Sequence, residues 1–103
     1  MHKYQILVEY SGDNFIGWQI QKKGKSVQKT IQITISRILK EKIKVVGSGR
    51  TDAGVHALGQ SAHFDCKKKI INLNKFLNSI NFFLNKKYIS ILSIKKKKIK
   101  LSF

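Results

Sequence analysis

The apolar residues of this chain of 103 amino acids follow two different periods, and the order of these periods restricts the fold. Alternation of apolar and polar residues is typical of strands, and it covers residues 3–10 and 59–66. Residues 43–49 and 88–94 also read as strands. Apolar residues three or four positions apart are typical of helices, and they cover residues 27–39 and 73–84. The predicted order is strand, helix, strand, strand, helix, strand.

Both predicted helices follow a residue that is a good N-cap. Ser26 precedes the first helix and Asn72 precedes the second. The apolar stripes that we expect to face the core are Val27, Ile31, Ile35, Ile38 and Leu39, then Leu73, Phe76, Leu77, Ile80 and Leu84. The first stripe is rich in β-branched residues, whose helix propensity is mediocre, so packing has to stabilise that helix. Phe82 and Phe83 are also expected in the core.

The βαββαβ order matches the ferredoxin-like motif, an α+β fold. Right-handed crossovers place both helices on one face of an antiparallel four-stranded sheet and leave the other face free. RNA-recognition domains use such a free face to stack bases. Their aromatic signature is missing from the third predicted strand, so the fold alone does not predict base stacking here.

The charge of the chain predicts a polyanionic partner. Lysine and arginine number 21 against 5 acidic residues, which gives a net charge of +16. Nucleic acid is the first candidate and an anionic membrane the second. The alternative is a compositional bias from an AT-rich genome, because proline is absent and arginine occurs only at Arg37 and Arg50. Charge runs such as Lys95 to Lys98 are usually a solvated face, and direct contact with RNA is the alternative for this run.

A single cysteine, Cys66, excludes an intramolecular disulfide and a multi-cysteine metal site. It ends an alternating run, so we expect it to pack inside a strand. The N-terminus shows no signal-peptide pattern, and no apolar run approaches membrane-spanning length. We expect a cytoplasmic protein that does not bind membranes.

Residues 49–60 read GRTDAGVHALGQ and place one carboxylate, Asp52, near one guanidinium, Arg50, between two predicted strands. Small neighbours leave Asp52 accessible, and Gly49 and Gly54 suit the backbone of a tight loop. Arg50 favours the ionised carboxylate, which can act as a nucleophile or a base. The same residues could also form an ordinary salt-bridged turn.

Other chemistries fit this loop poorly. It carries no second acidic residue, which disfavours a hydrolase with paired carboxylates. His56 and His63 lie seven positions apart with only Asp65 nearby, so their spacing does not suggest a metal site. A phosphate-binding glycine loop with its Lys-Ser/Thr pair is also missing.

Residues 49–60 closely resemble the catalytic motif of the tRNA pseudouridine synthase A family. Residues 15–21, which read FIGWQIQ, resemble the Gly-Trp-Gln segment of that family, and residues 26–28 resemble the start of its first helix. The match continues through His63 and Phe64 into the third predicted strand. These blocks stand in the family's order over nearly the whole chain.

The resemblance implies an RNA isomerase that converts uridine to pseudouridine on the 3′ side of the anticodon stem-loop of tRNA. The uracil is detached from C1′, turned and rejoined through C5, without a cofactor or a metal. By motif match Asp52 is the catalytic aspartate. The residues leave open whether it attacks C1′, attacks the base or removes a sugar proton. The family also implies a homodimer.

The resemblance further implies substrate-binding residues. Arg50 matches the residue that enters the space left by a flipped base, and Thr51 and His56 are further candidates for substrate contact. For His56, shaping of the loop is an equal alternative. Lys22, Lys23 and Lys25 follow the Gly-Trp-Gln segment, and we expect them to contact RNA phosphates. Trp18 reads first as a packing residue.

Family members are about twice as long or longer, with a second ferredoxin-like half. We therefore expect residues 1–103 to be the N-terminal, catalytic-loop domain, with the C-terminal half of the family absent. That half carries the tyrosine that stacks on the target uracil and a basic residue that supports the aspartate. The alternatives are a non-catalytic basic RNA-binding module and a decayed remnant.

Overall fold

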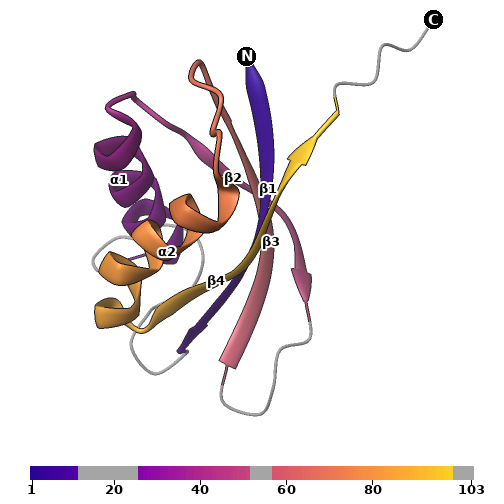
Figure 1. Ribbon diagram of the computed structural model, residues 1–103. Coiled ribbons are helices and arrows are strands. Elements are labelled where there is room, and N and C mark those ends of the chain that lie inside the picture. Colours follow the sequence, from indigo (N-terminus) through magenta and orange to yellow (C-terminus); the bar gives the residue numbers. More distant parts are fainter. Residues whose placement is uncertain (12–25, 52–56, 99–103) are drawn as a thin grey trace, which may run out of the picture.

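The computed structural model describes residues 1–11, 26–51 and 57–98, except for the side chains of residues 50, 51, 57 and 58. Its elements follow the predicted order (Figure 1). They are β1 (His2–Ser11), α1 (Val27–Leu39), β2 (Val45–Thr51), β3 (Ala57–Cys66), α2 (Leu73–Leu84), a 3₁₀ turn η1 (Asn85–Lys87) and β4 (Ile89–Lys97).

The four strands form one sheet in the order β2-β3-β1-β4, and all neighbouring strands are antiparallel. Both helices lie on the same side of this sheet (Figure 1). The other face of the sheet is not covered by a helix of the described structure. The prediction of an α+β, ferredoxin-like fold is confirmed.

Side-chain hydrogen bonds fix α1 and the start of β2 together. Ser26 caps the helix, since its Oγ accepts from the amide of Lys29 at 3.1 Å, a contact worth about 1 kcal/mol. Gln32 Oε1 accepts from the amide of Val45 at 3.1 Å. Gln28 Nε2 donates to the backbone oxygen of Val45 at 2.5 Å. These two glutamines anchor the first residue of β2, the strand that leads to residues 49–51.

The second helix is held in a comparable way. Asn72 Oδ1 accepts from the amide of Lys75 at 3.0 Å and caps α2. Near the other end, the side chain of Asn81 donates to the oxygen of Ile91 at 2.9 Å and accepts from its amide at 2.7 Å. This pair of bonds coincides with a register shift in the pairing of β1 with β4, between Leu7 and Val8. Asn81 thus satisfies backbone groups at the irregularity.

The core lies between the sheet and the helices. Every second residue of β1 is buried, and these side chains meet the helix stripes and alternate residues of β3. The ring of Tyr4 stacks on Phe64 at 5.6 Å between centroids, and its hydroxyl accepts from the amide of Ile70 at 2.8 Å. Cys66 is fully buried, as expected, and burial raises the pKa of its thiol.

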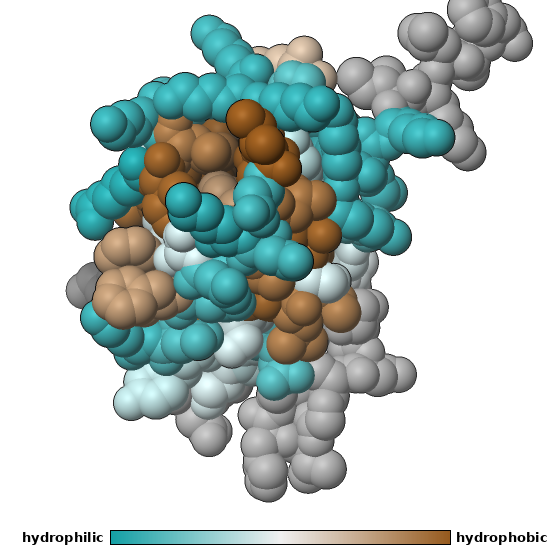
Figure 2. All heavy atoms as spheres, in the orientation of Figure 1, coloured by the Kyte–Doolittle hydropathy of each residue, from teal (hydrophilic) through white to brown (hydrophobic). Residues whose placement is uncertain are grey.

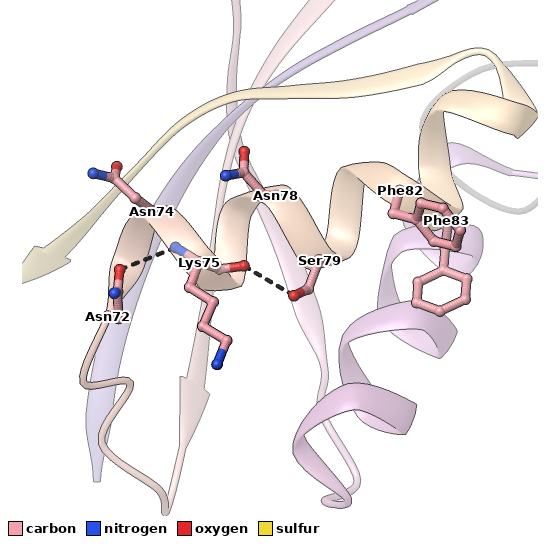
Figure 3. A pocket seen from close by; sticks show the side chains of 7 residues that line it. All are labelled: Asn72, Asn74, Lys75, Asn78, Ser79, Phe82 and Phe83. Carbon is pink, nitrogen blue, oxygen red and sulfur yellow. Dashed lines mark hydrogen bonds between the residues drawn. The ribbon is translucent and has the colours of Figure 1, made fainter.

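The core prediction is wrong for Phe82 and Phe83. Phe76 is buried as predicted, but these two rings are 61% and 49% exposed. Residues 76, 80 and 84 of α2 point to the sheet. Phe82 stands two positions from both Ile80 and Leu84, which turns it to the far side of the helix, and Phe83 lies at the edge of the buried face. Figure 3 shows both rings among polar side chains that line a hollow on α2, and the Lys86 ammonium lies 4.3 Å from the centre of the Phe82 ring.

The strand ends also differ from the prediction. β2 continues to Thr51, two residues beyond the predicted end, and β3 begins at Ala57 rather than Gly59. β4 extends through Lys97 and so takes in most of the lysine run. In each case a neighbouring strand supplies backbone hydrogen bonds that the hydrophobic pattern does not reveal.

Candidate active site

The predicted catalytic segment begins as the end of a strand. Arg50 and Thr51 are the last residues of β2, and their backbones are paired with β3. Asp52 and His56 lie outside the described residues, in the connection between Thr51 and Ala57. The sheet therefore fixes both ends of this connection. The partners across the two strands are Gly49 with Ser61, Arg50 with Gln60 and Thr51 with Gly59.

A buried glutamine supports this strand end. The side chain of Gln60 is only 5% exposed. Its amide nitrogen donates to the oxygen of Gly49 at 2.9 Å and to the oxygen of Ser61 at 2.9 Å. A buried amide without partners costs about 1–3 kcal/mol, so these contacts hold Gln60 in one position. Gln60 thereby links β3 to β2 directly before Arg50.

The pairing of β2 with β3 shifts between Gly47 and Gly49, so Ser48 is an extra residue in its strand. Such a bulge changes the twist of a strand and often stands next to an active site. Ser48 Oγ lies 3.1 Å from Nδ1 of His63, on the exposed side of the sheet. His63 is an ordinary strand residue, as predicted.

The prediction of a special backbone conformation is wrong for Gly49. It lies in the extended strand, and a Cβ built on it meets no heavy atom within 4 Å. Space is therefore open beside the residue that precedes Arg50. Gly54 lies outside the described residues.

Three parts of the chain meet at this end of the sheet. Ser11, the last residue of β1, is paired with Ala57, the first residue of β3. The amide of Ser11 also donates to the oxygen of Tyr88, just before β4, at 3.2 Å. The end of β1 thus lies beside the start of β3, the strand that follows the Asp52 connection. Lys22, Lys23 and Lys25, like Trp18, lie outside the described residues.

Sequence reasoning missed Gln60 as a supporting residue, although it closes the motif. Its position in the alternation of β3 could have indicated this role. Gln60 stands between Leu58 and Ala62, at a position where alternation predicts an apolar side chain facing the helices.

Within residues 1–11, 26–51 and 57–98, no three His, Cys, Asp or Glu side chains gather closely enough to bind a metal ion. In the same ranges, neither helix has the length and apolarity needed to cross a membrane.

Comparison with known proteins places this fold in a family. Residues 6–101 match the family described as tRNA pseudouridine synthase. The chain belongs to the tRNA pseudouridine synthase family. The matched range contains residues 49–60 and takes in α1, α2 and nearly all of the sheet.

Two relatives show how much of a family member is present. Over 100 residues the chain is 65% identical to tRNA pseudouridine synthase A of Pelagibacter ubique, covering 97% of this chain and 41% of that protein. Over 92 residues it is 46% identical to tRNA pseudouridine synthase A of Neorickettsia sennetsu, covering 89% of this chain and 38% of the relative. The chain therefore spans about two fifths of the length of these relatives.

Proposed function

We propose that residues 1–103 form the N-terminal, catalytic-loop domain of a tRNA pseudouridine synthase, which converts uridine to pseudouridine in the anticodon stem-loop of tRNA. The main support is that both ends of GRTDAGVHALGQ, residues 49–51 and 57–60, are strands in the sheet of a family member. The pairing of Arg50 with Gln60 and the buried amide of Gln60 fix the strand that precedes Asp52.

The proposed reaction moves one bond of the nucleoside. The bond from C1′ to N1 of uracil breaks, and a bond from C1′ to C5 forms. C5 loses its proton and N1 gains one, so atoms and electrons balance without an external oxidant or reductant. Asp52 is the proposed catalytic carboxylate, acting as a nucleophile on C1′ or on the base, or as the base that removes a sugar proton.

We propose that Arg50, Thr51 and His56 bind the target nucleotide. Flipping a base out of its stack costs a few kcal/mol, which contacts to the flipped nucleotide must offset. The planar guanidinium of Arg50 can stack and donate several hydrogen bonds, which suits the space that the base leaves. Residues fixed in a sheet hold such a group more accurately than residues of a loop. The backbones of Arg50 and Thr51 are in β2, which supports this assignment.

The proposed partner is tRNA, bound with its anticodon stem-loop at the end of the sheet where β2 and β3 are joined. Lys22, Lys23 and Lys25 are the proposed phosphate contacts there, and the working assembly is a homodimer in the cytoplasm. No cofactor or metal is part of the proposal. The remaining three fifths of a full-length relative would supply the rest of the substrate pocket.

Release of tritium from C5 of labelled uridine in tRNA measures the reaction directly, because the proton at C5 is lost when the new bond forms. We expect a chimera to release tritium. In this chimera the present chain replaces the 100 matching residues of the Pelagibacter ubique protein. The proposal is wrong if the chimera folds and binds tRNA but releases none.

A non-catalytic RNA-binding module is the second candidate, and the charge of +16 favours it. It predicts RNA binding that weakens steeply with salt in the chain alone. It also predicts no tritium release, either in the chain or in the chimera. The two candidates therefore differ in the chimera.

A further inference from the structure

Three lysines, Lys3, Lys95 and Lys97, form a ladder at the end of the sheet opposite to the Asp52 connection. The register of β1 with β4 places Lys3 directly opposite Lys97 and Gln5 opposite Lys95. Tyr4 and the alternate residues of β1 face the helices, so Lys3, Lys95 and Lys97 share the uncovered face of the sheet. Figure 2 shows hydrophilic side chains gathered at the top of the molecule, where the N-terminus and the far part of β4 lie in Figure 1.

Like charges directly opposite each other in a sheet repel, so this arrangement weakens the fold unless an anion relieves it. Among the described residues, Asp65 is the one carboxylate in register with the ladder, where it is paired with Lys3. The carboxylate of Glu41 is engaged elsewhere, since it accepts from the amides of Lys67 and Lys68 at 2.8 and 3.0 Å. The cations of the ladder thus exceed the nearby acids.

A hollow and a positive electrostatic potential at this end of the sheet suit a bound anion. A hollow of about 570 Å³ is lined by Met1, His2, Lys3, Lys96, Lys97 and Lys98. Burial, and then repulsion from Lys96, the N-terminal amine and Lys69, lower the pKa of His2. The lysines and the amine that oppose protonation of His2 create a positive potential here, which attracts phosphate groups.

We propose that Lys3, Lys95 and Lys97 form a second contact for the phosphate backbone of the RNA substrate, at the far end of the sheet from Asp52. This inference rests on the proposed function, which brings an RNA to the same domain. The ten residues of β1 separate the two ends by about 30 Å, since each strand residue advances about 3.4 Å. The ladder would therefore contact the stem rather than the reacting loop.

The neighbours of the ladder favour RNA backbone over stacked bases or a lipid surface. On the uncovered face the next side chains include Gln5, which donates to Ser61 Oγ at 2.8 Å, and His63. Such groups can bond a phosphate or a 2′-hydroxyl. The apolar side chains nearby are Met1, exposed at the hollow, Val46, exposed opposite His63, and Leu7, half-buried in the middle of the face; they are fewer than the polar and cationic groups around them.

A charge-matched comparison tests the proposal in this chain. The ladder variant carries Lys3→Gln, Lys95→Gln and Lys97→Gln. The control variant carries Lys29→Gln, Lys75→Gln and Lys87→Gln, three exposed lysines on α1, α2 and η1. Binding of a fluorescent RNA hairpin with a long stem is measured between low and moderate salt. We expect the ladder variant to bind roughly tenfold or more weakly, with a salt slope smaller by about 2 to 3, and the control to change by less than threefold.

Equal losses in the two variants would overturn the proposal, because they would show an effect of net charge alone. The proposal would also be overturned if the ladder variant bound the RNA hairpin as tightly as the parent, even if it lost its binding to phosphatidylserine vesicles. Thermal melting checks the fold, and we expect no loss of stability in the ladder variant because repulsion is removed. The test is independent of catalysis: a chimera without activity contradicts the proposed function and leaves the binding comparison intact.

Discussion

The side-chain amide of Gln60 donates to the oxygen of Gly49 at 2.9 Å, across the two strands that carry the proposed catalytic segment. Both hydrogens of this amide are used, since the second acceptor is the oxygen of Ser61. Gln60 is also buried. One side chain thus joins β2 and β3 at the residue before Arg50, so changes at Gln60 should affect the fold and the site together.

Replacing Gln60 with leucine should lower the free energy of unfolding by about 1–3 kcal/mol, because the two part-buried hydrogen bonds that its amide donates are lost. Urea denaturation measures the change. The matched control is Gln5→Leu, whose amide bonds one hydroxyl on the uncovered face. We expect the control to cost less than about 1 kcal/mol. Equal losses would show that the contact with Gly49 has no special weight.

Gly49→Ala should leave the stability of the chain unchanged or raise it by up to about 1 kcal/mol. The added methyl group meets no atom within 4 Å, and alanine restricts the unfolded chain. Thermal melting checks this result, and a clear loss of stability would contradict it. In the chimera, the same variant tests whether substrate occupies the open space beside Gly49. A fall in activity without a fall in stability would indicate that it does.

Asn81→Ala should destabilise the chain by about 2 kcal/mol, since the amide and the oxygen of Ile91 both lose a partner. We also expect the amide proton of Ile91 to exchange faster with solvent. The control is Asn78→Ala, an exposed residue of the same helix. If amide exchange at Ile91 is unchanged in Asn81→Ala, this side chain does not stabilise the irregularity in β4.

Glu41 should make stability depend on acid pH. The hydrogen bond from the amide of Lys67 lowers the pKa of this carboxyl group most, and the one from the amide of Lys68 lowers it less. Partial burial raises the pKa but does not cancel these effects. A lowered pKa in the folded state means that the stabilisation is present above the unfolded pKa. It is lost as pH falls through the folded pKa. Glu41→Gln should therefore melt lower near neutral pH and show a smaller decrease on acidification. A parallel pH profile in the two proteins would contradict this assignment.

Much of the fold follows from short-range patterns. The alternation of β1 and the caps Ser26 and Asn72 predict three elements close to their observed bounds, because these signals act within one strand or one turn. Phe82 and Phe83 were misplaced because hydrophobicity alone does not give the direction of a side chain around a helix axis.

The candidate site was predictable in its motif but not in its support. The strand that carries Arg50 and Thr51 continues beyond the predicted end because β3 lies beside it, and sequence does not give the register of a pairing. The role of Gln60 depends on the same register, since its acceptor at Gly49 is 11 positions away along the chain. The lysine ladder likewise appears only once β1 is aligned with β4.

The central claim is that Asp52 carries the chemistry, and one comparison in the chimera tests it most directly. Tritium release from uridine labelled at C5 is measured for Asp52→Asn and for Asp65→Asn, which removes an exposed carboxylate at the far end of β3. We predict a rate at least about a hundredfold lower for Asp52→Asn, with tRNA binding retained, and a rate near that of the parent for Asp65→Asn. Equal rates in the two variants would contradict the account.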